Sequence, residues 1–94
     1  MKTIMKHRLS TKNDVQRIKL PEEGIVREVA FSYQERDLCL WVEVPAGSVL
    51  DNSAVERSFK VFRTGDGIPD NARYIGSALE VMRPDAFHVF ELFE

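Results

Sequence analysis

The chain has 94 residues, of which 44% are hydrophobic and 30% are charged, and Cys39 is its single cysteine. This composition is typical of one small globular domain and excludes an internal disulfide framework. No apolar run reaches the roughly 18 residues that a membrane-spanning helix needs. Thirteen Lys and Arg against fifteen Asp and Glu give a formal net charge of -2, which argues against a dedicated nucleic-acid-binding protein because such proteins carry a basic surplus.

The hydropathy pattern has a period of two, which is typical of β-strands. It predicts strands over residues 4–9, 16–20, 25–33, 38–44, 55–63, 73–81 and 87–93, in that order. The polar segment at residues 34–37 is short enough to join the third and fourth strands as a hairpin, and Pro45 ends the fourth strand because it has no N–H for the ladder. We therefore predict one all-β domain over residues 1–94, a small antiparallel β-sandwich or incomplete barrel of about six to seven strands.

The last predicted strand is rich in aromatic residues on both faces. Such a strand is either central in its sheet or covered by a second copy of the chain, so we expect a homo-oligomer, most simply a two-fold dimer. Four aromatic residues lie in the strongest alternating segments and are predicted to be largely buried: Phe31, Trp41, Phe59 and Phe90.

The residues that commonly carry chemistry form no recognisable constellation. His7 and His88 lie in the first and last predicted strands, and no clustered ligands complete a metal site around them. Cys39 lies mid-strand beside Trp41 and is interpreted as a buried apolar cysteine. No serine lies in a nucleophile elbow. We therefore expect no catalytic residues, no metal and no cofactor.

Aromatic residues on the predicted hairpin raise the question of base stacking. Phe31, Tyr33 and Trp41 could stack on nucleobases, as aromatic residues do in oligonucleotide-binding barrels. The same hairpin, however, carries the acidic residues Glu28, Glu35, Asp37 and Glu43. Core packing explains the three aromatic residues more simply, so a nucleic-acid partner is not expected.

The turn after the fifth predicted strand is the best candidate for a binding site. Its two glycines allow backbone N–H groups to converge on an anion, and a hairpin-like return would bring Arg63 and Arg73 to one rim, where planar guanidinium groups pair with phosphate or carboxylate in two-point fashion. The candidate ligand- or partner-binding residues are Arg63, Thr64, Gly65, Asp66, Gly67, Arg73 and Tyr74. The alternative is a purely structural turn, in which glycine supplies a positive φ and Asp66 neutralises one arginine.

Short motifs follow one another along nearly the whole chain: Met1-Lys2-Thr3-Ile4, Lys19-Leu20-Pro21, Leu38-Cys39-Leu40-Trp41, Phe62-Arg63-Thr64-Gly65, Ile68-Pro69, Tyr74-Ile75-Gly76 and His88-Val89-Phe90-Glu91. In this order and spacing they resemble a family of small all-β proteins of unknown function carried by bacteriophages and prophages. The central turn of that family reads Gly-Thr-Gly-His or Gly-Thr-Gly-Asn followed by Pro-Ile. This chain departs from it at Arg63, Asp66 and Gly67, so it has no histidine in the turn. The resemblance implies a phage setting and brings no established activity.

Three hypotheses about function follow. The first is a non-enzymatic phage accessory protein that binds a host protein, as a counter-defence inhibitor would, in the cytoplasm of the host bacterium. A lone cysteine fits that reducing compartment. The alternative is an oligomeric β-scaffold that binds or sequesters a nucleotide-like phosphorylated ligand through Arg63, Arg73, Tyr74 and the turn between the two arginines. A small hydrolase is the third.

Overall fold

The computed structural model describes residues 1–49, 54–80, 83 and 85–93, which form seven β-strands and one 3-10 turn. In chain order the elements are β1 (Lys2–Leu9), β2 (Gln16–Pro21), β3 (Ile25–Ser32), β4 (Asp37–Pro45), η1 (Ala46–Val49), β5 (Ala54–Arg63), β6 (Arg73–Glu80) and β7 (Asp85–Leu92). The all-β prediction is confirmed, and β3 and β4 form the predicted hairpin. The predicted end of the sixth strand at Val81 and residues 50–53, between the fourth and fifth predicted strands, lie outside the described residues.

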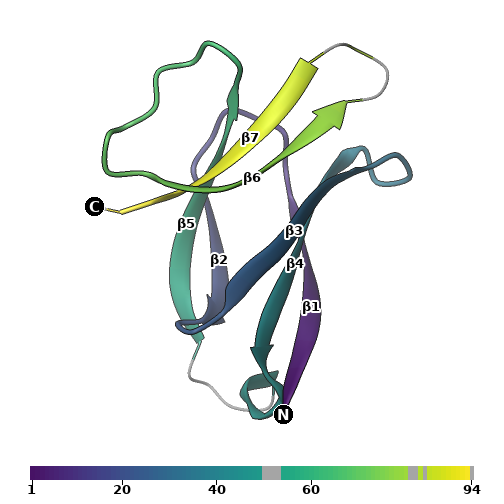
Figure 1. The fold of residues 1–94 in the computed structure, drawn as a ribbon, viewed down its shortest axis with the longest axis vertical. Coiled ribbons are helices and arrows are strands. Elements are labelled where there is room, and N and C mark those ends of the chain that lie inside the picture. Colours follow the sequence, from purple (N-terminus) through teal and green to yellow (C-terminus); the bar gives the residue numbers. More distant parts are fainter. Residues whose placement is uncertain (50–53, 81–82, 84, 94) are drawn as a thin grey trace.

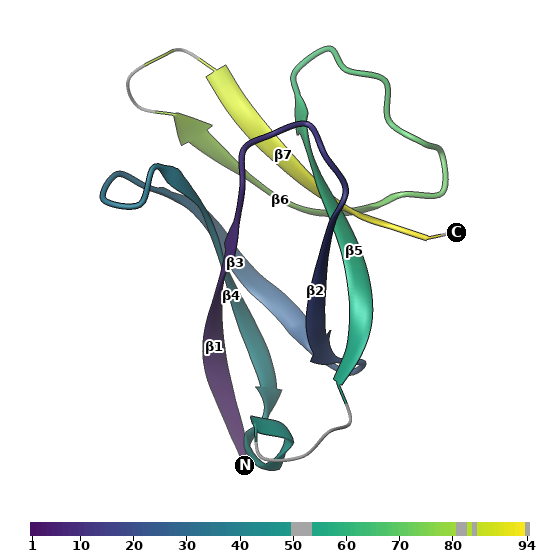
Figure 2. The same ribbon diagram turned by 180° about the vertical axis from the view of Figure 1, so that it is seen from behind.

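The strands form two antiparallel sheets, with the orders β1-β4-β3 and β2-β5-β7-β6 (Figure 1). The connection from β1 to β2 passes from the three-stranded sheet to the four-stranded sheet, as Figure 2 shows from behind. The C-terminal strand β7 lies between β5 and β6, so this apolar strand is central within a single chain. That is the first of the two arrangements expected for it.

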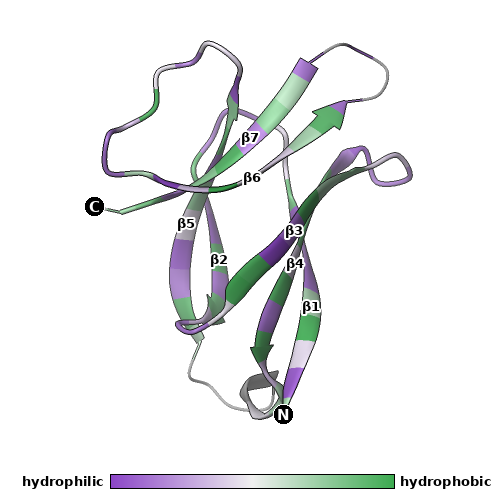
Figure 3. Ribbon diagram, viewed as in Figure 1, coloured by the Kyte–Doolittle hydropathy of each residue, from purple (hydrophilic) through white to green (hydrophobic). Residues whose placement is uncertain are grey.

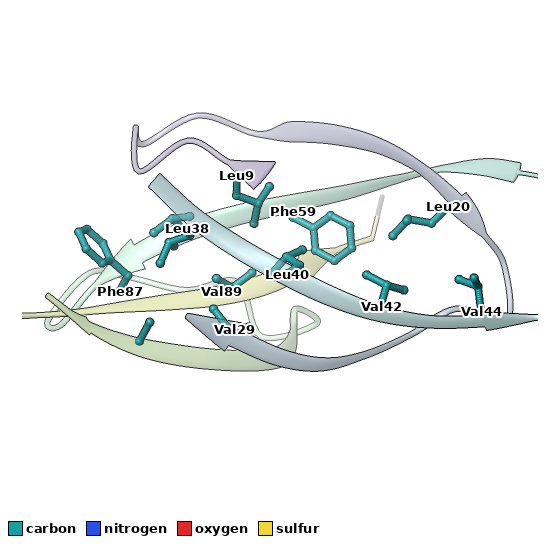
Figure 4. Close-up of a cluster of buried hydrophobic side chains, with 12 residues drawn as sticks. Leu9, Leu20, Val29, Leu38, Leu40, Val42, Val44, Phe59, Phe87 and Val89 are labelled. Atoms are coloured by element: carbon teal, nitrogen blue, oxygen red, sulfur yellow. The ribbon is translucent and has the colours of Figure 1, made fainter. Parts of the chain in front are cut away.

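The two sheets share one apolar core because the strand pleat sends alternate residues to the same side. Figure 3 shows the hydropathy along the ribbon: β3 carries both hydrophilic (purple) and hydrophobic (green) segments, as a strand with one inner and one outer face does, whereas the β3–β4 turn is hydrophilic. Figure 4 shows the core side chains, with Phe87 and Leu38 at one end of the cluster and Leu20 and Val44 at the other. The buried cluster consists of Leu9, Leu20, Val29, Leu38, Leu40, Val42, Val44, Phe59, Val61, Ala78, Phe87 and Val89. Full burial of each large side chain contributes about 1.5 to 3 kcal/mol.

The four aromatic residues that were predicted to be largely buried divide into two groups. Phe59 is fully buried, at 0% exposure. Phe31 is half-buried and packs against the edge of the core. Trp41 and Phe90 are also half-buried, because they alternate with the inward-facing residues of β4 and β7 and therefore lie on the outer faces of their sheets. None of the four is more than half exposed, as predicted, but alternation does not by itself say which face of a strand is the inner one.

Two close contacts fix how the chain packs. Gly76 of β6 faces Val29 of β3, and a Cβ at position 76 would lie 2.8 Å from Val29 Cγ2. The second contact is an ion pair between Arg57 of β5 and Glu91 of β7. The Glu91 carboxylate accepts from Arg57 Nε at 2.7 Å and from Nη2 at 2.8 Å, and Arg57 Nη1 donates to the carbonyl of Gly24 at 2.7 Å. This hydrogen bonding to Glu91 raises the pKa of Arg57.

Candidate functional site

The structure does not bring Arg63 and Arg73 to one rim. Because β7 lies between β5 and β6, Arg63 is opposite Phe87 whereas Arg73 is opposite Glu91. These two β7 positions are four residues apart, which is about 13 Å along a strand. Arg73 instead lies over the ring of Phe93, 5.1 Å from its centroid, and 4.0 Å from Glu91. The predicted hairpin-like return was wrong because it assumed that consecutive strands pair.

The glycine-containing turn lies on the surface, as predicted. Its own residues act as hydrogen-bond partners for one another. Gly65 has a φ of 97°, which only glycine adopts readily. The backbone N–H of Asp66 donates to the Arg63 carbonyl at 3.0 Å, and the Asp66 carboxylate accepts from the Arg63 backbone N–H at 2.8 Å. An anion at this turn would meet that carboxylate. Gly67 is exposed, with no atom within 4 Å of the position that a Cβ would take.

Thr64 and Tyr74 lie in a chain of hydrogen bonds on the outer face of the four-stranded sheet. Tyr74 Oη is 2.8 Å from Ser77 Oγ, which is 2.8 Å from His88 Nδ1, and His88 Nε2 is 2.9 Å from Thr64 Oγ1. Ser77 and His88 were not among the predicted site residues, although strand alternation places both on this face. A serine beside an imidazole is the geometry of an activated nucleophile. Both ring nitrogens of His88 hydrogen-bond to hydroxyl groups, those of Ser77 and Thr64.

A cavity of about 680 Å³ opens where the two sheets meet the β3–β4 turn, next to the Phe87 end of the core. We call it the arginine–aromatic pocket. It is lined by Thr11, Phe31, Tyr33, Arg36, Arg63, Glu80, Arg83 and Phe87. Of the residues predicted for the site, only Arg63 lines this pocket. The other lining residues come from the β1–β2 connection, β3 and its turn, β6, Arg83 between β6 and β7, and β7, so no single stretch of sequence signals the pocket.

Three aromatic rings form one side of the pocket. The rings of Phe31 and Phe87 stack at 5.8 Å with planes 12° apart, and Tyr33 meets Phe31 edge-on at 5.8 Å. The Arg63 guanidinium lies 4.1 Å above the centroid of Phe87. Tyr33 is 51% exposed, so its ring is available at the pocket rather than packed in the core as the sequence suggested.

Arg36 holds an unusual backbone conformation at the pocket. Its φ is 56°, in the left-handed region, and its backbone N–H donates to the Ser32 carbonyl at 2.7 Å to close the turn. A left-handed conformation costs a non-glycine residue about 1 to 2 kcal/mol. Strain of this kind collects at functional sites, where the surrounding structure holds it in place.

Contacts with β1 provide that support for the turn. Lys6 Nζ lies 3.2 Å from a Glu35 carboxylate oxygen, and Arg8 Nε donates to Asp37 at 2.8 Å. Arg8 Nη2 also donates to the Glu35 carbonyl at 2.9 Å. The buried thiol of Cys39 donates to Glu35 at 3.2 Å; this bond, and then Lys6, lowers the pKa of Glu35, while burial raises the pKa of Cys39. The turn that carries Tyr33 and Arg36 is therefore tied to its neighbouring strand.

Comparison with known proteins places the chain in a family. Its residues 1–94 match the family described as Domain of unknown function (DUF7352). The chain belongs to this family. No curated protein and no solved structure matches it. The description of DUF7352 assigns no activity.

In this DUF7352 chain, one arginine of the pocket has carboxylate partners and two have none among the described residues. Arg63 Nη1 donates to Asp85 at 2.6 Å and lies 3.9 Å from Glu80. The Ala86 N–H and then the Arg63 guanidinium lower the pKa of Asp85. Within the described ranges no carboxylate pairs with the guanidinium of Arg36 or Arg83, and both residues are exposed. The pocket therefore offers free cationic groups beside an aromatic wall.

Two other features are absent from the same described part of the chain. No group of three or more His, Cys, Asp or Glu side chains there could hold a metal ion. No helix there is long and apolar enough to cross a membrane.

Proposed function

We propose that this protein is a non-enzymatic binding protein and that the arginine–aromatic pocket binds a nucleotide-like phosphorylated ligand. The observation that carries the proposal is the presence of the uncompensated guanidinium groups of Arg36 and Arg83 in the same cavity as the exposed ring of Tyr33. A guanidinium pairs with phosphate oxygens in two-point fashion, and an aromatic side chain stacks on a base whatever its identity. A volume of about 680 Å³ also suits a small-molecule ligand.

The setting of this activity is part of the same proposal. The resemblance to proteins carried by bacteriophages supports a role in the cytoplasm of an infected bacterium. A protein that binds a phosphorylated signal without converting it would act by lowering the free concentration of that signal. Such sequestration needs the protein at a concentration comparable to that of the signal.

A thermal-unfolding screen against nucleoside diphosphates tests the proposal. A ligand at a hundredfold excess over its Kd should raise the free energy of unfolding by about 2.7 kcal/mol. Arg36→Gln removes a charge-assisted contact and should weaken binding by about 1.5 to 3 kcal/mol. Arg73→Gln is the matched control, because Arg73 is an exposed arginine outside the pocket. If no nucleotide shifts the unfolding transition, or if both variants lose binding equally, the pocket is not the site.

A specific observation favours a second candidate, the binding of a host protein. Tyr74 and Leu79, on the outer face of the four-stranded sheet, are 58% and 73% exposed and adjoin the hydrogen-bonded chain of Ser77 and His88. Tyrosine is enriched among the residues that dominate protein interfaces. Capture of one host protein by the wild type, and its loss with Leu79→Arg but not with Arg36→Gln, would support this candidate. If the wild type and both variants capture the host protein equally, the outer face is not the binding surface.

A further inference from the structure

A carboxylate in the wall of the arginine–aromatic pocket bears on which base the pocket selects. Glu80, the last residue of β6, lines the cavity, and its side chain is 19% exposed. Its Oε2 lies 3.9 Å from Arg63 Nη1, whereas Asp85 accepts a hydrogen bond from that same nitrogen at 2.6 Å. No hydrogen bond among the described residues uses the Glu80 carboxylate. Its oxygens therefore keep free capacity to accept hydrogen bonds from a ligand.

We infer that the ligand of the pocket is a guanine nucleotide, an inference that rests on the proposed function of the same site. The Watson–Crick edge of guanine presents two adjacent donors, N1–H and the exocyclic N2 amine. A carboxylate has two acceptor oxygens and no donor when ionised, so it matches this pair. Adenine presents an acceptor, N1, at the corresponding place, and a carboxylate repels it. A carboxylate in a base-binding wall therefore discriminates between the two purines.

The remaining lining residues leave a partner for each part of such a ligand. Tyr33 supplies an exposed ring for the face of the base, and Thr11 supplies a hydroxyl. Arg36 enters from the β3–β4 turn, a different element from the β6 end that carries Glu80. Glu80 and Arg36 thus give the base edge and the phosphates oppositely charged partners on two different elements.

Isothermal titration of the full chain with GDP and ADP tests the inference. We expect the wild type to bind GDP at least tenfold more tightly than ADP. Glu80→Gln replaces one acceptor oxygen with an amide donor, so it should weaken GDP by about tenfold, the usual effect of losing one charge-assisted hydrogen bond, and should leave ADP unchanged or tighter. Glu56→Gln is the matched control, because Glu56 is an exposed glutamate of β5 that does not line this pocket. Unfolding midpoints without ligand show whether each variant is folded.

The outcomes distinguish a failure of the guanine inference from a failure of the proposed function. Equal affinity for GDP and ADP, or an equal loss of both in Glu80→Gln, overturns the guanine inference and leaves the proposed function standing. Binding of pyrophosphate as tightly as GDP also overturns it, because the base then contributes nothing. If no nucleotide binds the wild type, the proposed function fails and the inference fails with it.

Discussion

At the scale of single residues, the ion pair between Arg57 and Glu91 is the contact whose loss should affect stability most. The Glu91 side chain is 4% exposed and that of Arg57 is 12% exposed, so water could hydrate either group only in part if its partner were lost. Glu91→Gln keeps the shape but leaves the guanidinium without its counter-charge, and we expect a loss of about 3 to 5 kcal/mol in urea unfolding. Glu56→Gln, whose side chain is 57% exposed and which faces Arg17, should change the same quantity by less than about 0.5 kcal/mol. A comparable loss in the two variants would contradict this.

His7 should make stability depend on pH near neutrality. It lies on β1 opposite Leu40, and burial lowers its pKa below the ordinary value of 6.5. The unfolded chain therefore takes up this proton more readily than the folded chain, so stability falls as the pH drops below that ordinary value. The unfolding midpoint should decrease between about pH 7.5 and pH 5.5, and His7→Gln should flatten the decrease. His88→Gln, measured alongside, isolates the contribution of the other histidine. An unchanged slope in His7→Gln would refute the assignment.

Carboxylates act in a different pH range. The pKa of Glu43 is lowered by its hydrogen bond to Arg27, and that of Asp85 by the Ala86 N–H and Arg63. Their ordinary values are 4.5 and 3.8, so the stabilisation that they provide is present above these values and is lost as the pH falls further. These groups therefore do not contribute to the change near neutrality.

At the scale of elements, the β3–β4 turn should show a separation between stability and binding. Arg36→Gly removes the left-handed strain at φ 56° but also the guanidinium, whereas Arg36→Ala removes only the guanidinium. We expect the glycine variant to be more stable than the alanine variant by about 1 kcal/mol, and both to bind nucleotide about tenfold or more weakly than the wild type. Calorimetric unfolding and titration measure the two quantities. If the alanine variant were the more stable one, the strain would not exist.

The contact between β3 and β6 should be sensitive to a single methyl group. In Gly76→Ala the new Cβ lies 2.8 Å from Val29 Cγ2, and relieving this overlap should cost about 1 to 3 kcal/mol. Removing the Val29 side chain beyond Cβ makes room, so the Val29→Ala, Gly76→Ala double variant should lose less stability than the sum of the single losses. Urea unfolding of the four proteins of this cycle gives the coupling. Additive losses would show that the cost of Gly76→Ala does not arise from its contact with Val29.

The sequence predicts the strands well because period-two alternation is a local property, and each strand lies close to its predicted range. Pairing is not local. Arg63 and Arg73 end and begin consecutive strands, yet β7 lies between those strands, and nothing near either arginine indicates this. The pocket escaped prediction for the same reason, since Arg36, Glu80 and Phe87 come together only through the tertiary fold. Tyr33 was interpreted as a core residue because alternation identifies a face without saying where the core ends.

At the scale of the whole molecule, self-association stays a prediction, but the fold moves the expected contact surface from β7 to the three-stranded sheet. Since β7 is covered within one chain, it no longer requires a second copy. Ile4 and Ile25, which flank Glu43 on the three-stranded sheet, are 50% and 46% exposed. We expect sedimentation velocity to show a dimer or larger species at tens of micromolar, and Ile4→Lys to shift it towards the monomer. A monomeric wild type at that concentration would end the expectation.

The central position of β7 also means that the four-stranded sheet stays incomplete until β7 is made. Within the described sheets, β6 is hydrogen-bonded only to β7, and β7 is made after every other strand. When β6 leaves the ribosome it has no sheet partner, and β5 has an unpaired edge towards the place that β7 will take. Contacts between distant parts of a chain form slowly, because the loops that separate them must be ordered first. The four-stranded sheet therefore keeps an open edge on β5 until β7 is inserted, and an open edge of this kind exposes the folding chain to aggregation.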